Sequence, residues 1–110
     1  MTTPNDTVDG SGPCKIPGYP EDRLPGNYGN SRGGVGTITS QTLKSSNCAY
    51  LRMGQIAGLD KVADLATKLG ITTPLNPAFS SMPIGAQEVY PLDMAAAYAT
   101  FANDGVRNPA

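Results

Sequence analysis

The sequence predicts a mainly α-helical chain behind a long N-terminal loop, and two observations support this fold class. Glycines and prolines follow one another so closely through residues 1–36 that no periodic apolar run fits between them. Beyond residue 36, apolar residues recur at the three- and four-residue spacing of helices, in segments that end in capping residues. No stretch predicts a convincing sheet. We therefore divide the chain into a Gly/Pro-rich loop or insertion, residues 1–36, and a helical part, residues 37–110.

The first two helices are expected on either side of a corner at residues 45–47. Thr37 can cap a short helix over residues 38–44, because a threonine hydroxyl can accept from the first free N–H groups of a helix. Asn47 can do the same for a second helix that begins at Cys48. The sequence therefore predicts a helix, a sharp change of direction, and another helix.

Gly58 is placed to end the second helix, and Gly54 lies inside it. A glycine in a helix interior costs about 1 kcal/mol relative to alanine, which suggests a close packing partner at Gly54. The apolar face of this helix is expected to consist of Ala49, Tyr50, Met53, Ile56 and Ala57.

The third helix shows the clearest pattern, with Asp60 in its first turn and Lys68 in its last. Gly70 can take the left-handed position after the helix, and Ile71 can then pack back on the last turn. The apolar stripe of this helix is Val62, Leu65, Ala66 and Leu69.

The fourth helix is expected to open at Pro91, the position that proline favours, and to close at Gly105. Before it, residues 81–85 are predicted to form a short extended segment. The fourth helix would present a face of mostly small residues that another element can approach closely: Leu92, Ala95, Ala96, Ala99 and Ala102.

The composition excludes several kinds of site. None of the 110 residues is histidine, so neither a Ser-His-Asp triad nor a histidine-containing zinc site can form within the chain. The net charge of -1 implies neither a nucleic-acid partner nor an anionic membrane surface. No apolar run reaches the roughly eighteen residues of a membrane span, and residues 1–6 lack the regions of a signal peptide.

Cys14 and Cys48 are the two cysteines, which are too few for a metal cluster of the usual kind. They could pair in an oxidising compartment and attach the N-terminal loop to the second helix. Two unpaired thiols are the alternative.

Ser45 and Asn47 are the candidate catalytic residues, at the predicted corner. Residues two apart on one continuous helix point in different directions, so only a corner lets both side chains face one pocket. Serine and asparagine are also ordinary turn residues, because their side chains bond to nearby backbone. The residues of the corner alone favour a plain turn between helices.

Four segments, in order across residues 37–109, resemble the transpeptidase domain of penicillin-binding proteins, most closely the bifunctional class A enzymes that build peptidoglycan. The first is Ser45-Ser46-Asn47, which matches the Ser-x-Asn motif of the family. Residues 84–89 are similar to its Leu-Gly-x-x-Glu-Val segment. Residues 59–71 and 91–103 resemble two of its helices. The resemblance implies the helical part of the α/β serine β-lactamase/transpeptidase-like fold, in incomplete form.

The chemistry that the resemblance implies is acyl transfer through a serine ester, without a cofactor or metal. In that family a nucleophilic serine in a Ser-x-x-Lys motif attacks a D-alanyl-D-alanine bond, and a Lys-Thr-Gly strand holds the substrate carboxylate. By resemblance, Ser45 would relay a proton between the lysine, the nucleophile and the departing amine. Asn47 would bond the amide of the acyl side chain and help to fix the lysine, since a carboxamide both donates and accepts.

The resemblance also implies partners and a location. The parent protein would bind peptidoglycan stem peptides and β-lactams, and this chain would pack against the rest of its transpeptidase domain. The expected location is the extracytoplasmic face of the bacterial cell membrane.

The chain departs from the family pattern in ways that bear on its activity. No serine has a lysine three residues later, and no lysine begins Lys-Thr-Gly. We therefore expect an interior fragment of a transpeptidase that is inactive alone. Tyr90 replaces the threonine that is usual before Pro-Leu-Asp, which removes the expected cap of the fourth helix at a cost of about 1 kcal/mol.

Two alternatives remain beside the transpeptidase. The chain could be a noncatalytic helical interaction module that keeps this scaffold and binds a partner through its alanine face. It could also be part of a penicillin sensor or a β-lactamase-like hydrolase, which share the serine-acylation chemistry. The deacylation kinetics of the parent protein would separate these hydrolases from a transpeptidase.

Overall fold

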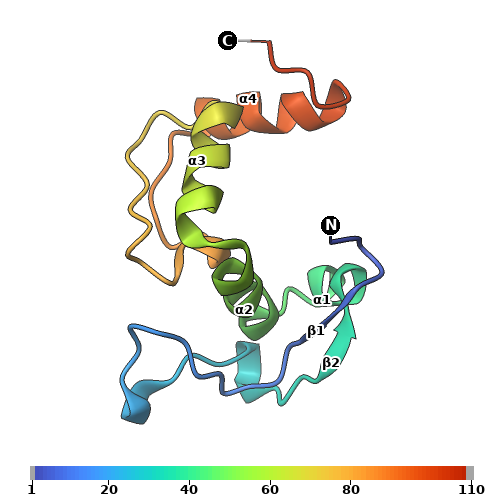
Figure 1. Cartoon of the computed structure of the whole chain (residues 1–110), viewed down its shortest axis with the longest axis vertical. Coiled ribbons are helices and arrows are strands. Elements are labelled where there is room, and N and C mark those ends of the chain that lie inside the picture. The colour runs from blue at the N-terminus through green and yellow to red at the C-terminus, as the bar shows by residue number, and fades with distance from the viewer. Residues whose placement is uncertain (1, 109–110) are drawn as a thin grey trace.

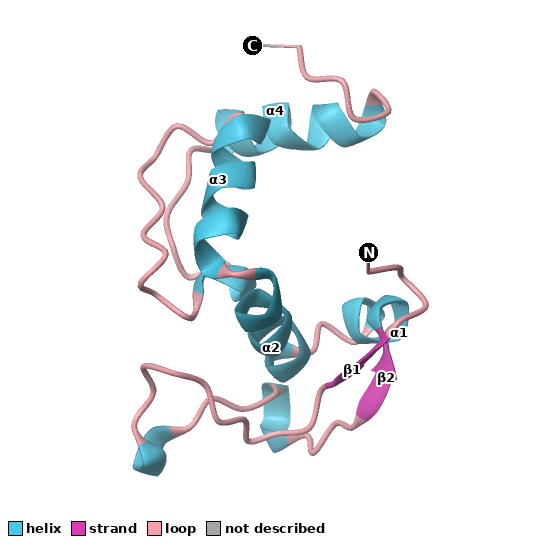
Figure 2. Ribbon diagram, viewed as in Figure 1, coloured by secondary structure: helices cyan, strands magenta, loops and turns pink. Residues whose placement is uncertain are grey.

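The structure, a computed structural model, describes residues 2–108, and helices dominate it (Figures 1 and 2). The α helices are α1 (Ile38–Leu43), α2 (Asn47–Ala57), α3 (Leu59–Leu69) and α4 (Pro91–Ala102). The strands are β1 (Thr7–Asp9) and β2 (Val35–Thr37). The mainly α fold class and the four expected helices are thus confirmed. Residue 1 and residues 109–110, which the predicted segments include, lie outside the described range.

The central element is α2, which contacts β1, α3 and the short 3₁₀ helix Met82–Ile84. In Figure 1, α2 and α3 follow one another along the long axis, and α4 lies across the far end of α3. The sheet and α1 lie together beside the opposite end of α2, and the N-terminal loop passes that same end.

The sheet is a feature that the sequence did not predict. β1 pairs with β2 in antiparallel register, with Thr7 opposite Thr37 and Asp9 opposite Val35. Each strand has three residues, and among them only Val8 is buried. Strands this short show no usable alternation, and the pairing joins segments that are far apart in the sequence, so local patterns could not reveal it.

The helix α1 is attached to this sheet by a buried glutamine. The hydroxyl of Thr37 accepts from the Ser40 N–H at 3.1 Å, which confirms the expected cap. The Nε2 of Gln41 donates to the carbonyls of Val8 at 3.2 Å and Gly34 at 2.8 Å. A buried amide with its donors paired fixes the orientation of α1 on the two strands.

The start of α2 and its buried face both differ from the expectation. Ser46 caps the helix, and its hydroxyl accepts from the Ala49 N–H at 3.2 Å, so Asn47 is the first helical residue and not the cap. Ile56, which was expected to be inside, is 79% exposed. The buried residues of α2 are Cys48, Ala49, Leu51 and Gly54.

A disulfide explains which face of α2 is buried. Cys14 and Cys48 form a disulfide with their Cα atoms 5.8 Å apart, so the alternative of two unpaired thiols is wrong. The two cysteines, with Ile16 and Leu51, form a buried cluster on which Tyr19 packs. Because the N-terminal loop supplies half of this cluster, it covers a face of α2 that helical periodicity alone could not select.

Residues 81–85 also differ from the expectation, because they form a turn and not an extended segment. Met82–Ile84 is a 3₁₀ helix that ends at Gly85, whose φ is 80°. Pro83 lies against Gly54, and a Cβ atom added at Gly54 would collide with the proline ring. The packing partner expected at Gly54 is therefore present, and the glycine permits a close approach there.

The C-terminal end of α3 agrees with the expectation better than its apolar face does. Gly70 has φ 121°, and the Ile71 N–H donates to the Ala66 carbonyl at 3.1 Å, which forms the expected Schellman end. Ile71 is buried. Leu65 of the predicted α3 stripe is 58% exposed, because no described element covers that side of the helix.

Tyr90 provides no side-chain cap for α4, as expected from its sequence. The Asp93 carboxylate, in the first turn of α4, accepts from the hydroxyl and the main-chain N–H of Thr72. These hydrogen bonds hold the pKa of Asp93 below its usual value. The buried residues of α4 are Ala97 and Thr100, neither of which belongs to the predicted small-residue face. It is Ala97 and Thr100 that lie inside where α4 packs on α3.

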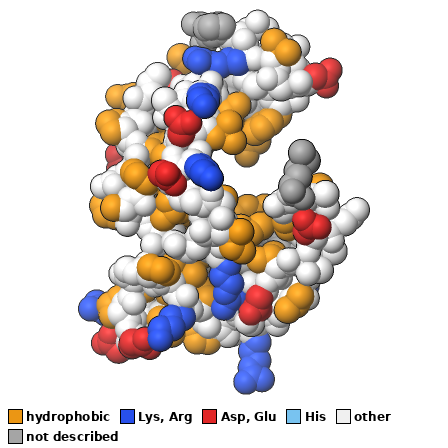
Figure 3. Space-filling view, viewed as in Figure 1, with side chains coloured by type: hydrophobic (Ala, Val, Ile, Leu, Met, Phe, Trp, Pro, Cys, Tyr) orange, Lys and Arg blue, Asp and Glu red, His pale blue; other side chains and the backbone are white. Residues whose placement is uncertain are grey.

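Large apolar side chains remain exposed over much of the surface. In Figure 3 they gather on the concave side of the molecule as well as at its edges. On α4 alone, Leu92, Tyr98 and Phe101 are each more than 60% exposed. Apolar surface on this scale is typical of an interface. No helix within residues 2–108 has the length and apolar character that crossing a membrane requires.

We predict that the disulfide contributes much of the stability of the region around α2. It closes a loop with a sequence separation of 34 residues, for which the loop-entropy relation gives about 4 kcal/mol at 25 °C. Adding dithiothreitol to the full-length protein should therefore lower the urea midpoint. The variant with both Cys14→Ala and Cys48→Ala is the matched control, since its midpoint should not respond to the reductant. An unchanged midpoint in the reduced protein would contradict the prediction.

Candidate active site

The two candidate residues from the sequence line the same surface pocket. This pocket has a volume of about 240 Å³ and is lined by Ser45, Ser46 and Asn47 together with Tyr50, Pro83 and Ile84. Ser45 is exposed and Asn47 is partly buried. The corner therefore brings a hydroxyl and a carboxamide to one opening, which is the arrangement that the sequence predicted.

The main chain at Ser45 is the unusual feature of this corner. Ser45 has φ 53°, in the left-handed region that serine seldom adopts. Its N–H donates to the Thr42 carbonyl at 3.1 Å, and the Ser46 N–H donates to the Gln41 carbonyl at 3.0 Å. These bonds form a Schellman end to α1, with serine in the place that glycine usually takes. A left-handed residue of this kind costs about 1–2 kcal/mol.

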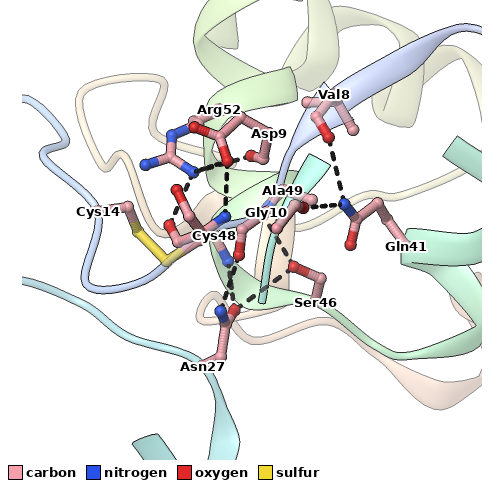
Figure 4. A network of polar contacts seen from close by, with 12 residues as sticks. Val8, Asp9, Gly10, Cys14, Asn27, Gln41, Ser46, Cys48, Ala49 and Arg52 are labelled. Carbon is pink, nitrogen blue, oxygen red and sulfur yellow. Dashed lines mark hydrogen bonds and ion pairs between the residues drawn. A yellow bond between two sulfur atoms is a disulfide. The ribbon is translucent and has the colours of Figure 1, made fainter. Parts of the chain in front are cut away.

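Two side chains satisfy the first N–H groups of α2. The Ser46 hydroxyl accepts from Ala49, while Oδ1 of Asn27 accepts from the Cys48 N–H at 3.1 Å. Figure 4 shows Asn27 reaching from the N-terminal loop to this helix start. The direction of α2 at the corner therefore depends on a residue that is 21 positions away from Cys48.

The amide of Asn47 is held on one side. Its Nδ2 donates to the Gly26 carbonyl at 3.2 Å, and no intramolecular donor to its Oδ1 is found within residues 2–108. The side-chain oxygen can therefore accept from a ligand in the pocket, since the orientation of the amide is fixed by the bond to Gly26.

A second pocket lies on the other side of Ser45. It has a volume of about 170 Å³ and is lined by loop residues between Asn27 and Gly34, by Gln41 of α1 and by residues 44–46. Ser45 and Ser46 line both pockets. Ser45 is thus an exposed residue that lines two pockets, and Lys44, which precedes it in the sequence, lines one of them.

Charged groups near the helix start are arranged around Arg52. Its Nη1 donates to the carbonyls of Asp9 and Ser11, each at 2.8 Å, and lies 3.6 Å from the Asp9 carboxylate. Hydrogen bonds from the main chain and side chain of Ser11, followed by the charge of Arg52, hold the pKa of Asp9 below its usual value. These contacts attach the end of β1 to α2.

No group of three potential metal ligands among histidine, cysteine, aspartate and glutamate occurs within the described residues.

Comparisons with known proteins give a sequence relative and a fold. No protein-family model matches the chain. It is 34% identical over 100 residues to penicillin-binding protein 1A of Aquifex aeolicus, a match that covers 90% of this chain and 14% of that protein. The chain thus spans about one seventh of the length of this relative.

The fold matches two solved structures of penicillin-binding protein A from Mycobacterium tuberculosis. One is a ceftriaxone acyl-enzyme complex, with a TM-score of 0.79 and 21% identity, and the other is an imipenem acyl-enzyme complex, with a TM-score of 0.80 and 22% identity. Each match covers 96% of this chain and less than a third of the other. The chain is thus similar, in sequence and in fold, to part of the transpeptidase domain of penicillin-binding proteins.

Reasoning from the sequence identified the corner but missed the residues that support it. Asn27 lies in a stretch that was read only as loop, and no periodic pattern marks it. The left-handed conformation of Ser45 was also missed, because the sequence has no glycine there to signal it. The one available signal was the spacing of the two expected helices, which left only Ser45 and Ser46 between the first helix and the expected cap Asn47.

We predict that Ser45→Gly stabilises this protein. Glycine removes the left-handed penalty of about 1–2 kcal/mol and adds about 0.5–1 kcal/mol of backbone entropy cost. The free energy of unfolding from urea titration should therefore rise by about 0.5–1 kcal/mol, whereas Ser45→Ala should give no such gain.

Asp104→Gly is the matched control, because Asp104 has φ 54° and lies beyond the end of α4, away from the corner. It should stabilise to a similar degree. A loss of stability in Ser45→Gly beside a gain in Asp104→Gly would show that Ser45 is not strained.

Proposed function

We propose that this chain supplies the Ser-x-Asn motif of a D,D-transpeptidase that cross-links peptidoglycan stem peptides. The observation that carries the proposal is the shared pocket of Ser45 and Asn47 at a corner where Ser45 adopts a strained conformation. Backbone strain tends to occur at functional sites, where the rest of the structure enforces it. The family assignment supports the reaction class.

In the proposed reaction, a serine and a lysine from another part of the domain complete the site. The serine oxygen attacks the carbonyl carbon of the D-alanyl-D-alanine bond, that C–N bond breaks, and the leaving amine takes a proton. Ser45 relays this proton, because a hydroxyl can accept one proton while it donates another. An amine of a second stem peptide then attacks the ester, which releases the serine and forms the cross-link.

Asn47 has the task of orientation. Its Oδ1 accepts from an N–H of the acyl part of the substrate, while the bond from Nδ2 to the Gly26 carbonyl keeps the amide from rotating. Holding the acyl group in line with the attacking oxygen lowers the barrier through proximity and orientation.

The proposed partners and location follow from the same assignment. The rest of the transpeptidase domain covers the exposed apolar side chains of α3 and α4, and β-lactams acylate the complete site. The proposed location is the extracytoplasmic face of the bacterial cell membrane, and the Cys14–Cys48 disulfide supports an oxidising compartment. The glycosyltransferase activity of the bifunctional class A proteins lies outside this proposal.

We predict that the full-length protein forms a covalent adduct with fluorescent penicillin and that Ser45→Ala slows its formation. Loss of a positioned proton-transfer group typically costs about 10²–10⁴-fold in rate, so the acylation rate constant should fall within that range. Ser45→Gly should be slow as well, although we expect it to be more stable, which separates chemistry from folding. Residues 1–110 alone should form no adduct.

Ser80→Ala and Asp104→Gly are the controls, since both residues lie outside the pocket at the corner and should leave acylation unchanged. An unaltered rate in Ser45→Ala, or an adduct on residues 1–110 alone, would contradict the proposal. The absence of any adduct in the full-length protein would favour a noncatalytic module. Rapid release of the bound penicillin would favour a β-lactamase-like hydrolase.

A further inference from the structure

We infer that Asn27 is a positioning residue for the Ser45–Asn47 corner, a role that rests on the proposed transpeptidase function. Asn27 lies in the N-terminal loop and belongs to neither α1 nor α2. It nevertheless makes direct hydrogen bonds to the residue between the two candidate catalytic residues and to the residue after them.

The amide of Asn27 uses its full hydrogen-bonding capacity. Oδ1 accepts from the Cys48 N–H at 3.1 Å and from the Ser46 hydroxyl at 3.4 Å. Nδ2 donates to the carbonyl of Gly10 at 2.8 Å and to that of Ser31 at 3.2 Å. An asparagine side chain offers two donor hydrogens and two acceptor lone pairs, and here all four are engaged.

These four bonds join three segments that the disulfide, Arg52 and main-chain hydrogen bonds also hold together. The donors of Asn27 hold the chain after β1 and the loop that leads to β2, while its acceptor holds the start of α2 (Figure 4). The neighbouring residue acts in the same place, because the Gly26 carbonyl accepts from Asn47. Residues 26 and 27 thus contact both the main chain of α2 and the side chain of Asn47.

The loop around Asn27 is packed too closely to move freely. A Cβ atom at Gly33 would meet Nδ2 of Asn27 at 3.0 Å and would also collide with the Gly10 carbonyl. A Cβ atom at Gly12 would lie at the same distance from Nδ2. On the other side, the Cys14 N–H donates to the Pro25 carbonyl at 2.9 Å, next to the disulfide. Contacts within the loop therefore fix the position of Asn27, in addition to its bonds to Ser46 and Cys48.

The consequence for the site follows from the strain at Ser45. A serine in the left-handed conformation persists only where the surrounding structure holds it there. Here the cap of α2 fixes Ser46, the residue that follows Ser45. Without Oδ1 of Asn27, Ser46 loses one partner and the Cys48 N–H loses its acceptor. The corner can then relax, and the Ser45 hydroxyl moves out of line with the reacting groups.

The test is the acylation of the full-length protein by benzylpenicillin, with the binding constant and the acylation rate constant measured separately by stopped flow. Asn27→Ala should lower the acylation rate constant by about 10–100-fold, the size of effect that a small misplacement of reacting groups gives. The binding constant should change less than the rate constant, because all four hydrogen bonds of the Asn27 amide are made to groups of the protein itself.

Asn27→Asp separates positioning from stability. Aspartate keeps the acceptor for Ser46 and Cys48, and its charge is favourable at a helix N-terminus. It loses both donors and places a carboxylate against the carbonyls of Gly10 and Ser31, so the protein should be less stable. If the acceptor positions the corner, Asn27→Asp should nevertheless recover most of the rate that Asn27→Ala loses.

Asn76→Ala is the matched control, since Oδ1 of Asn76 caps a local turn by accepting from Ala78 at 2.9 Å, in a loop with no contact to the corner. It should leave the acylation rate constant unchanged. A wild-type rate in Asn27→Ala, or an Asn27→Asp variant as slow as Asn27→Ala while both are folded, would overturn the inference. A wild-type protein that forms no adduct would overturn the proposed function, and the inference with it.

Discussion

The attachment of the N-terminal loop to the first turn of α2 is the constraint on which the rest of this structure depends. Free N–H groups at a helix start need acceptors, and here Ser46 supplies one locally while Asn27 supplies the other from the loop. The Cys14–Cys48 disulfide lies on the same turn and brings the loop to the same helix. Together they give the chain its small core and fix the direction in which α2 leaves the corner.

Holding a helix start in this way makes the strained corner possible. Only Lys44 and Ser45 lie between the end of α1 and the cap of α2, and Ser45 reverses the chain in a conformation that suits glycine better. Glycine would fit the backbone but would bring no hydroxyl to the pocket. The choice of serine therefore costs stability at a place where the proposed chemistry needs an oxygen, which is a common form of the trade-off between stability and activity.

Only part of the apolar surface of the chain is buried. The buried cluster is centred on four residues, whereas large side chains of α3 and α4 remain in solvent. The chain spans less than a third of the matching penicillin-binding protein A structures. The loop and the corner, by contrast, have their partners within residues 2–108, so the geometry of the candidate site is largely internal to this chain.

The sequence by itself determined the features that depend on neighbouring residues. Thr37 and Gly70 mark helix ends through bonds to residues at most a few positions away, and the corner at Ser45 and Asn47 follows from the spacing of two adjacent helices. The family resemblance could also be recognised from the sequence, because it rests on short segments that follow one another in order.

Only the tertiary structure decided which helix faces are buried, and the reason is that burial depends on partners that are distant in the sequence. Ile56 has the periodicity of a core residue but lies in solvent, while Gly54 is inside because Pro83 packs against it. The pairing of β1 with β2, the disulfide and the cap from Asn27 likewise join segments whose approach no local pattern records. The side chains of the candidate site could be named from the sequence, but what holds them in place could not.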